Sequence, residues 1–126
     1  KWSPDGNLIS FLSDRSGAFE LYLLQYGTGN LRQMTHLSSV NWFGYTWSPD
    51  GKSIYLNYVL GSDSDTRILA AINVSSGAMH KILEAKASLT RPVPIGWSVA
   101  TDDEMLYFVG KDYSPGDIWI ADLVYE

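Results

Sequence analysis

The chain has 126 residues, of which 45% are hydrophobic and 18% charged, a composition typical of one globular domain and not of a disordered segment. Its net charge of −5 and the lack of a basic cluster argue against a nucleic-acid partner. The absence of cysteine excludes a disulfide framework and a cysteine-based zinc site, and no apolar stretch is long enough for a membrane span.

The first unit opens on the pentapeptide Trp-Ser-Pro-Asp-Gly at residues 2–6. Pro4 presets the backbone of the second turn position, and we expect Gly6 to take the positive φ that closes a hairpin. Alternating apolar residues then predict strands at 8–12 and 19–24 and a short outer strand at 31–35. The turns between them fall at 13–17 and 27–29.

The second unit repeats this order. A strand at 41–47 leads into a second copy of the pentapeptide at 47–51. Strands rich in β-branched and aromatic residues follow at 54–60 and 68–74, with a fourth at 79–83. The loop at 61–65 is longer than its counterpart in the first unit.

The third unit is degraded. Trp97 and Ser98 align with the start of the pentapeptide, and residues 100–104 replace the Pro-Asp-Gly turn. We expect an inner strand at 93–97, whose prolines fit only the edge of a sheet, and further strands at 105–109 and 118–124. Ser98 is then a turn residue, like Ser3 and Ser48.

A strand-only repeat of about 45–50 residues is typical of β-propeller blades. We therefore expect an all-β chain of about three blades of four-stranded antiparallel sheet, at roughly residues 1–36, 37–84 and 85–126. The first unit lacks most of its inner strand and the third lacks its outer strand. The repeated residues are interpreted as structural, with each tryptophan buried between blades: Trp2, Pro4, Asp5, Gly6, Trp47, Pro49, Asp50, Gly51 and Trp97.

The first unit resembles the WD40-like repeat of TolB-type propellers. The shared pattern is the pentapeptide, an apolar strand, Ser13-Asp14-Arg15 with Gly17, then Leu21-Tyr22 and finally Met34-Thr35. The resemblance implies a six-bladed ring and, if the role is TolB-like, a periplasmic protein of the Tol–Pal system. Similar repeats form the propellers of prolyl-oligopeptidase-like serine peptidases, so fold does not decide function.

Apparent catalytic motifs have simpler explanations. Residues 96–100 mimic a nucleophile elbow, but that motif needs a strand-to-helix turn, and Ser98 aligns with turn serines. His36 and His80 are expected on strands or the surface, without the serine and acid of a triad. The acidic turns at 63–65 and 102–104 carry too few oxygens for a calcium loop, so we predict no metal and no cofactor.

The residues that break the repeat are the better binding candidates. Loops between blades and loops between second and third strands share one face of a propeller, which should gather mixed aromatic and charged side chains of the kind found at recognition surfaces. The alternative is that Trp42 and Phe43 merely pack. The candidates are His36, Trp42, Phe43, Asp63, Asp65, Arg91, Asp112 and Tyr113.

The sequence predicts a non-catalytic scaffold for a protein or peptide, in the periplasm or outside the cell, with the cytoplasm as the other compartment. One alternative is the substrate-gating propeller of a serine peptidase whose catalytic domain lies elsewhere, and another is a propeller for a carbohydrate or small ligand. Open blade edges at both ends predict either a homodimer that closes a six-bladed ring or the remainder of a longer chain. The start at Lys1, directly before a repeat, favours the longer chain.

Overall fold

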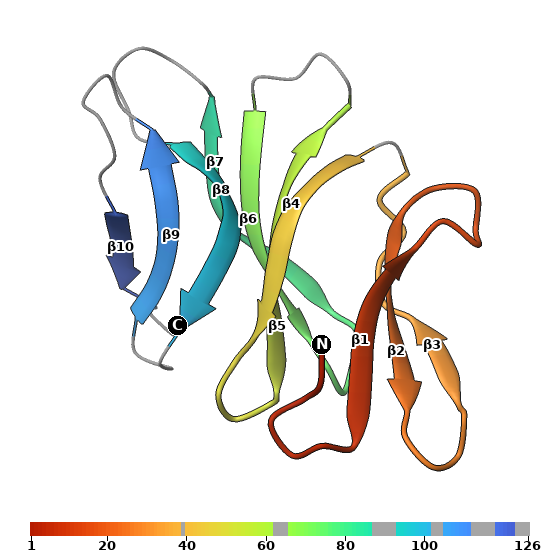
Figure 1. Ribbon diagram of the computed structural model, residues 1–126. Coiled ribbons are helices and arrows are strands. Elements are labelled where there is room, and N and C mark those ends of the chain that lie inside the picture. Colours follow the sequence, from red (N-terminus) through yellow and green to blue (C-terminus); the bar gives the residue numbers. More distant parts are fainter. Residues whose placement is uncertain (39, 62–65, 87–92, 102–104, 112–117, 123–126) are drawn as a thin grey trace.

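The computed structural model describes residues 1–38, 40–61, 66–86, 93–101, 105–111 and 118–122. Within those ranges the chain forms strands, turns and extended segments, with no helix. The strands make three antiparallel sheets that stand side by side in sequence order (Figure 1). The all-β prediction is confirmed, and over the described residues the sheets have three, four and three strands, as expected.

Each sheet is a run of consecutive strands. Sheet 1 contains β1 (Leu8–Ser13), β2 (Glu20–Gln25) and β3 (Leu31–Gln33). Sheet 2 contains β4 (Val40–Trp47), β5 (Ser53–Leu60), β6 (Thr66–Asn73) and β7 (Met79–Lys86). Sheet 3 contains β8 (Val93–Thr101), β9 (Met105–Lys111) and β10 (Ile118–Asp122).

The two complete pentapeptides form matching turns. Gly6 and Gly51 have φ values of 73° and 72°, so the predicted positive φ is confirmed at both. In each turn the serine hydroxyl accepts from the backbone N–H five residues later, at 2.9 Å, and donates to the aspartate two residues later. Serine, aspartate and glycine therefore recur together because each has a separate task in closing the turn.

The main hydrophobic core lies between sheets 1 and 2. Leu21, Leu23 and Met34 contribute from the first sheet and its exit. They pack with a row on the facing side of sheet 2 that comprises Tyr45, Trp47, Ile54, Leu56, Tyr58, Ile68, Ala70 and Ile72. A polar contact crosses the same core, because Trp47 Nε1 donates to Ser10 Oγ at 2.8 Å.

The tryptophans of the repeat are not equivalent. Trp47 is 8% exposed, as predicted for a residue between blades, whereas Trp2 is 54% exposed and the expectation of burial is wrong there. Trp47 has sheet 1 to pack against, while Trp2 makes an edge contact with Tyr26 at 5.3 Å between ring centroids. No strand within the described ranges covers the Trp2 ring. The side chain of Trp97 is not among those that the structure describes.

Strand β8 differs from the prediction at Ser98. It continues through Val93–Thr101, so Ser98 lies inside a strand and not in a turn. The sequence after Ser98 lacks the proline and glycine that end the strand in the first two units, and β-branched residues favour its continuation. The register of β8 against β9 shifts between Pro94 and Val99, and β8 is an edge strand, as its prolines predicted.

Candidate partner-binding site

The predicted binding residues that the structure describes lie at the end of sheets 1 and 2 remote from the pentapeptide turns. Ser13 pairs with Glu20 at that end of sheet 1, and Val40 pairs with Leu60 at that end of sheet 2. We call this region the rim and define it by four residues: Phe19, His36, Trp42 and Leu60.

A buried carboxylate fixes the segment that carries His36. Glu20 is 2% exposed and accepts from the backbone N–H of Leu37 at 2.7 Å and of Ser38 at 3.0 Å. Thr35 Oγ1 donates to the same carboxylate and accepts from the Leu21 N–H at 2.8 Å. Because every one of these donors is satisfied, residues 35–38 at the exit of sheet 1 have a defined path, and His36 is held exposed upon it.

Trp42 links the two sheets at the rim. Its Nε1 donates to the Phe19 carbonyl at 2.7 Å, and its ring packs on Tyr58 with centroids 5.9 Å apart. Burial raises the pKa of Tyr58. The indole is partly buried, which means that Trp42 packs as well as contributing to the rim surface.

The sequence did not single out the most exposed apolar residues of the rim. Phe19 is 56% exposed and Leu60 is 45% exposed. Both residues belong to apolar segments that the sequence predicts as strands. The alternation of apolar and polar residues alone does not reveal which strand residues stay exposed beyond the neighbouring sheet. Nearby, the Arg15 guanidinium lies over the rings of Phe11 and Tyr22, at 5.2 and 4.9 Å from their centroids.

The other predicted binding residues cannot be placed on this surface. Phe43 lies in β4, but its side chain is outside the described set. Asp63, Asp65, Arg91, Asp112 and Tyr113 also fall outside the described residues. Hydrogen bonds to Glu20 and to the Phe19 carbonyl thus hold His36 and Trp42 at the same end of the molecule. That the remaining candidates lie on the same surface stays a prediction.

The described residues hold no arrangement typical of hydrolysis or metal binding. His36 follows sheet 1 and His80 lies in β7 of sheet 2, and the elbow-like sequence is part of β8. Over the described ranges there is no cluster of three or more His, Cys, Asp or Glu side chains suited to a metal ion. Nor do those ranges contain a helix long and apolar enough to cross a membrane.

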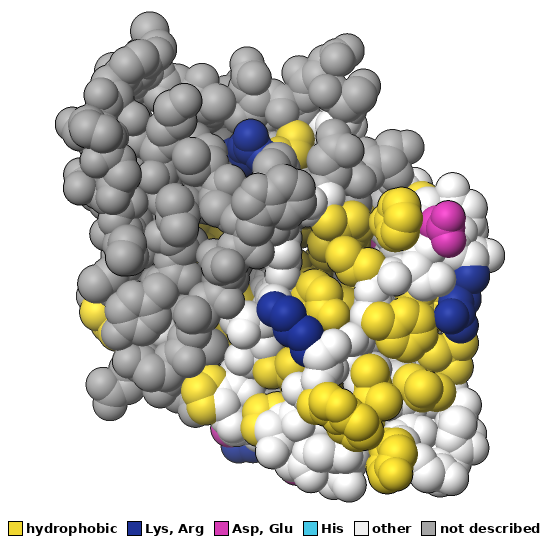
Figure 2. Space-filling model, viewed as in Figure 1, with side chains coloured by type: hydrophobic (Ala, Val, Ile, Leu, Met, Phe, Trp, Pro, Cys, Tyr) yellow, Lys and Arg dark blue, Asp and Glu magenta, His cyan; other side chains and the backbone are white. Residues whose placement is uncertain are grey.

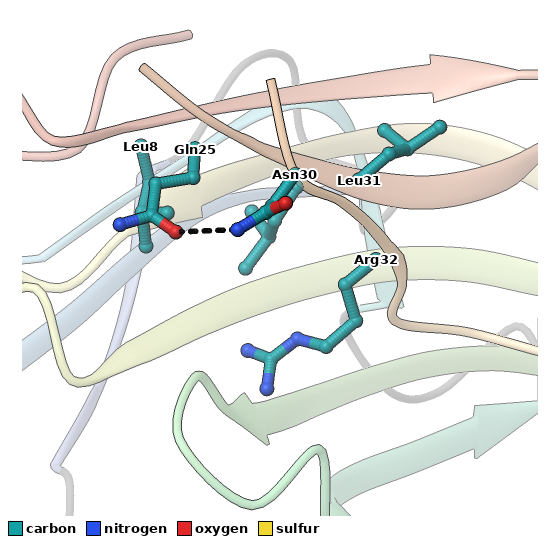
Figure 3. A pocket seen from close by; sticks show the side chains of 6 residues that line it. Leu8, Gln25, Asn30, Leu31 and Arg32 are labelled. Carbon is teal, nitrogen blue, oxygen red and sulfur yellow. Dashed lines mark hydrogen bonds between the residues drawn. The ribbon is translucent and has the colours of Figure 1, made fainter. Parts of the chain in front are cut away.

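A separate hollow of about 370 Å³ lies at the opposite end and is lined by residues of sheet 1 and its β2–β3 turn (Figure 3). Apolar side chains and two amides line it, with a hydrogen bond from Asn30 to Gln25 at 3.4 Å. The Arg32 guanidinium donates to the carbonyls of Val74 and Ser75, the second at 3.0 Å. Arg32 therefore ties the two sheets together, and this hollow is not continuous with the rim.

Comparison with known proteins supports the TolB-like interpretation of this geometry. No family model matches the chain. The protein TolB of the Tol-Pal system of Francisella tularensis is 33% identical over 81 residues, which cover 64% of this chain and 18% of that protein. "Uncharacterized peptidase YuxL" of Bacillus subtilis is 40% identical over 65 residues, 48% of this chain and 9% of that protein.

Among solved structures, TolB from Acinetobacter baumannii superposes with a TM-score of 0.65 at 25% identity, over 96% of this chain and 28% of that one. The fold is thus that of TolB-like β-propeller blades, and the resemblance noted from the sequence is confirmed. The chain spans less than a fifth of the length of the two curated relatives named above.

Proposed function

We propose that the chain is part of a non-catalytic β-propeller scaffold that binds a protein or peptide at the rim. The observation that carries the proposal is that Phe19 is 56% exposed and that its carbonyl accepts a hydrogen bond from the Trp42 indole. Exposed aromatic residues next to partly buried aromatic anchors are typical of protein-recognition surfaces. The similarity to a Tol-Pal system protein supports a protein partner and a periplasmic or extracellular location.

The test is selection of peptides from a displayed library on the purified chain, followed by affinity measurements on rim variants. We expect Phe19→Ser and Leu60→Ser to weaken the selected peptides at least tenfold, since both remove exposed apolar surface. Tyr26→Ser is the matched control, because Tyr26 is equally prominent but lies at the opposite end. Peptides that lose affinity for the control and not for the rim variants would overturn the proposal.

The match to YuxL supports a second candidate, the propeller portion of a serine peptidase that gates substrate entry. In that case the same rim would contact substrate peptides, while bond cleavage would need a catalytic domain beyond these 126 residues. A fluorogenic peptide ester tests whether this chain is itself catalytic, which neither candidate function requires. We expect no hydrolysis by this chain, and hydrolysis abolished by Ser98→Ala would contradict both.

A further inference from the structure

The hollow at the end remote from the rim combines an apolar wall with hydrogen-bond donors. Its lining consists of three leucines and three polar residues: Leu8, Leu23, Leu31, Gln25, Asn30 and Arg32. Figure 2 shows further hydrophobic side chains gathered over sheet 1, so apolar surface alone does not single out a site on this sheet. What distinguishes the hollow is that one arginine and two amides surround the same space of about 370 Å³ (Figure 3).

Contacts with sheet 2 hold the Arg32 guanidinium in place. Its two terminal nitrogens donate to the carbonyls of Val74 and Ser75, in the turn between β6 and β7. An arginine carries more N–H donors than two carbonyls accept, so further donors remain on the guanidinium. The ion pairs among the described residues do not include Arg32. Arg32 is therefore a positioned cation, and such a guanidinium binds carboxylates through charge-assisted hydrogen bonds.

The two amides add donors to the same space. Asn30 Nδ2 donates to Gln25 Oε1 at 3.4 Å, and the described part of the chain gives Gln25 Nε2 no acceptor. The carboxylates of Asp5 and Asp50 accept hydrogen bonds within the pentapeptide turns and do not line the hollow. The lining thus has more donors than acceptors, and its one charged group is positive, which favours an anionic ligand.

We propose that the hollow binds a small carboxylic acid that carries an apolar side chain or tail. The carboxylate accepts from Arg32 and Gln25 Nε2, while the apolar part packs on Leu8 and Leu31. The volume falls within the range of about 300–1,000 Å³ that is usual for small-molecule sites. Since the hollow lies at the opposite end of the sheets from the rim, this inference goes beyond the proposed function, and either can fail without the other.

The experiment is an NMR titration of the ¹⁵N-labelled chain with N-acetyl-leucine and with its uncharged amide, N-acetyl-leucinamide, each up to about 20 mM at low salt. We expect the acid to shift the side-chain N–H signals of Gln25 and Arg32 and to bind at least tenfold more tightly than the amide. N-acetyl-alanine should bind at least threefold more weakly than N-acetyl-leucine, because it has less apolar surface to bury.

A short peptide that ends in leucine distinguishes the source of the carboxylate. Binding as tight as that of N-acetyl-leucine means that the end of a polypeptide enters the hollow, and weaker binding means that the hollow takes free acids. Both outcomes support a carboxylate site.

Arg32→Met tests the cation while keeping the length of the side chain. We expect it to raise the dissociation constant of N-acetyl-leucine at least tenfold. Arg15→Met is the matched control, because it removes the same charge from an exposed arginine at the other end of sheet 1, and it should change that constant less than twofold. Since Arg32 also joins the two sheets, circular dichroism establishes that Arg32→Met folds; should it not, the comparison of acid and amide on the unmodified chain decides the question.

Three results would overturn the proposal. The first is a titration in which N-acetyl-leucine shifts no signal up to about 20 mM. The second is equal affinity for the acid and the amide, which would mean that no cation contributes. The third is a set of shifted signals that excludes Gln25, Asn30 and Arg32, because the acid would then bind elsewhere.

Discussion

Glu20 offers the sharpest test of how the chain passes from sheet 1 to sheet 2. Its carboxylate satisfies two backbone N–H groups and the Thr35 hydroxyl in a site that is 2% exposed. Glu20→Ala leaves those donors without an acceptor, and each unsatisfied buried donor costs about 1–3 kcal/mol. Allowing for water that enters the space, we expect a loss of about 2–5 kcal/mol in the free energy of unfolding.

Glu20→Gln separates shape from charge. The amide oxygen can still accept from the Leu37 and Ser38 N–H groups, and the amide nitrogen can donate to Thr35 Oγ1 if the hydroxyl turns away. Only the charge assistance of these hydrogen bonds is lost, so we expect the free energy of unfolding to fall by about 1–2 kcal/mol. Glu84→Ala is the control: Glu84 is exposed, pairs with Lys81, and should contribute less than about 1 kcal/mol.

The assay is equilibrium urea unfolding followed by tryptophan fluorescence. With a slope of about 2 kcal/mol per molar urea, Glu20→Ala should lower the midpoint by about 1–2.5 M and Glu20→Gln by about 0.5–1 M. A Glu20→Ala midpoint no lower than that of Glu84→Ala would show that the network does not hold the connection.

Three further predictions concern the turns and the rim. Gly51→Ala should destabilise by about 1–2 kcal/mol because φ is 72°, and urea unfolding against Lys52→Ala, expected near zero, checks this. Hydrogen bonds from the Lys52 N–H and the Ser48 hydroxyl lower the Asp50 pKa. Asp50 therefore stabilises the fold fully above about pH 4, and this stabilisation falls as the pH drops below about 4. A urea midpoint that rises on acidification would contradict this. Phe19→Ser should leave the free energy of unfolding unchanged within about 0.5 kcal/mol, because the ring is exposed; a larger loss would mean that the ring packs.

The sequence was sufficient where one local signal determines structure. The Pro-Asp-Gly turns followed from the need for positive φ at Gly6 and Gly51, and the strands of the first two units followed from alternation. Ser98 was misassigned because alignment to the repeat outweighed the loss of the proline and glycine that end a strand. Trp2 was misassigned because burial depends on which sheet lies alongside, and a repeat pattern does not state that.

The candidate site was predicted less completely. His36 and Trp42 stood out because they break the repeat. The structure holds the segments that carry them at the same end of sheets 1 and 2, and their role in binding a partner stays a prediction. Glu20 was not recognised, because a glutamate inside an alternating strand gives no sign that it will bind a loop 17 residues away. Contacts of that kind depend on how two sheets are placed, which no window of local sequence encodes.

The account depends most on the claim that sheets 1 and 2 stack as neighbouring propeller blades, with the Trp47 indole bonded to Ser10 across the contact. A double-mutant cycle with Ser10→Ala and Trp47→Phe measures that contact directly by urea unfolding. The two residues are 37 positions apart and lie on different sheets. We predict a coupling free energy of about 0.5–1.5 kcal/mol, whereas fully additive effects of the two substitutions would contradict the stacked arrangement.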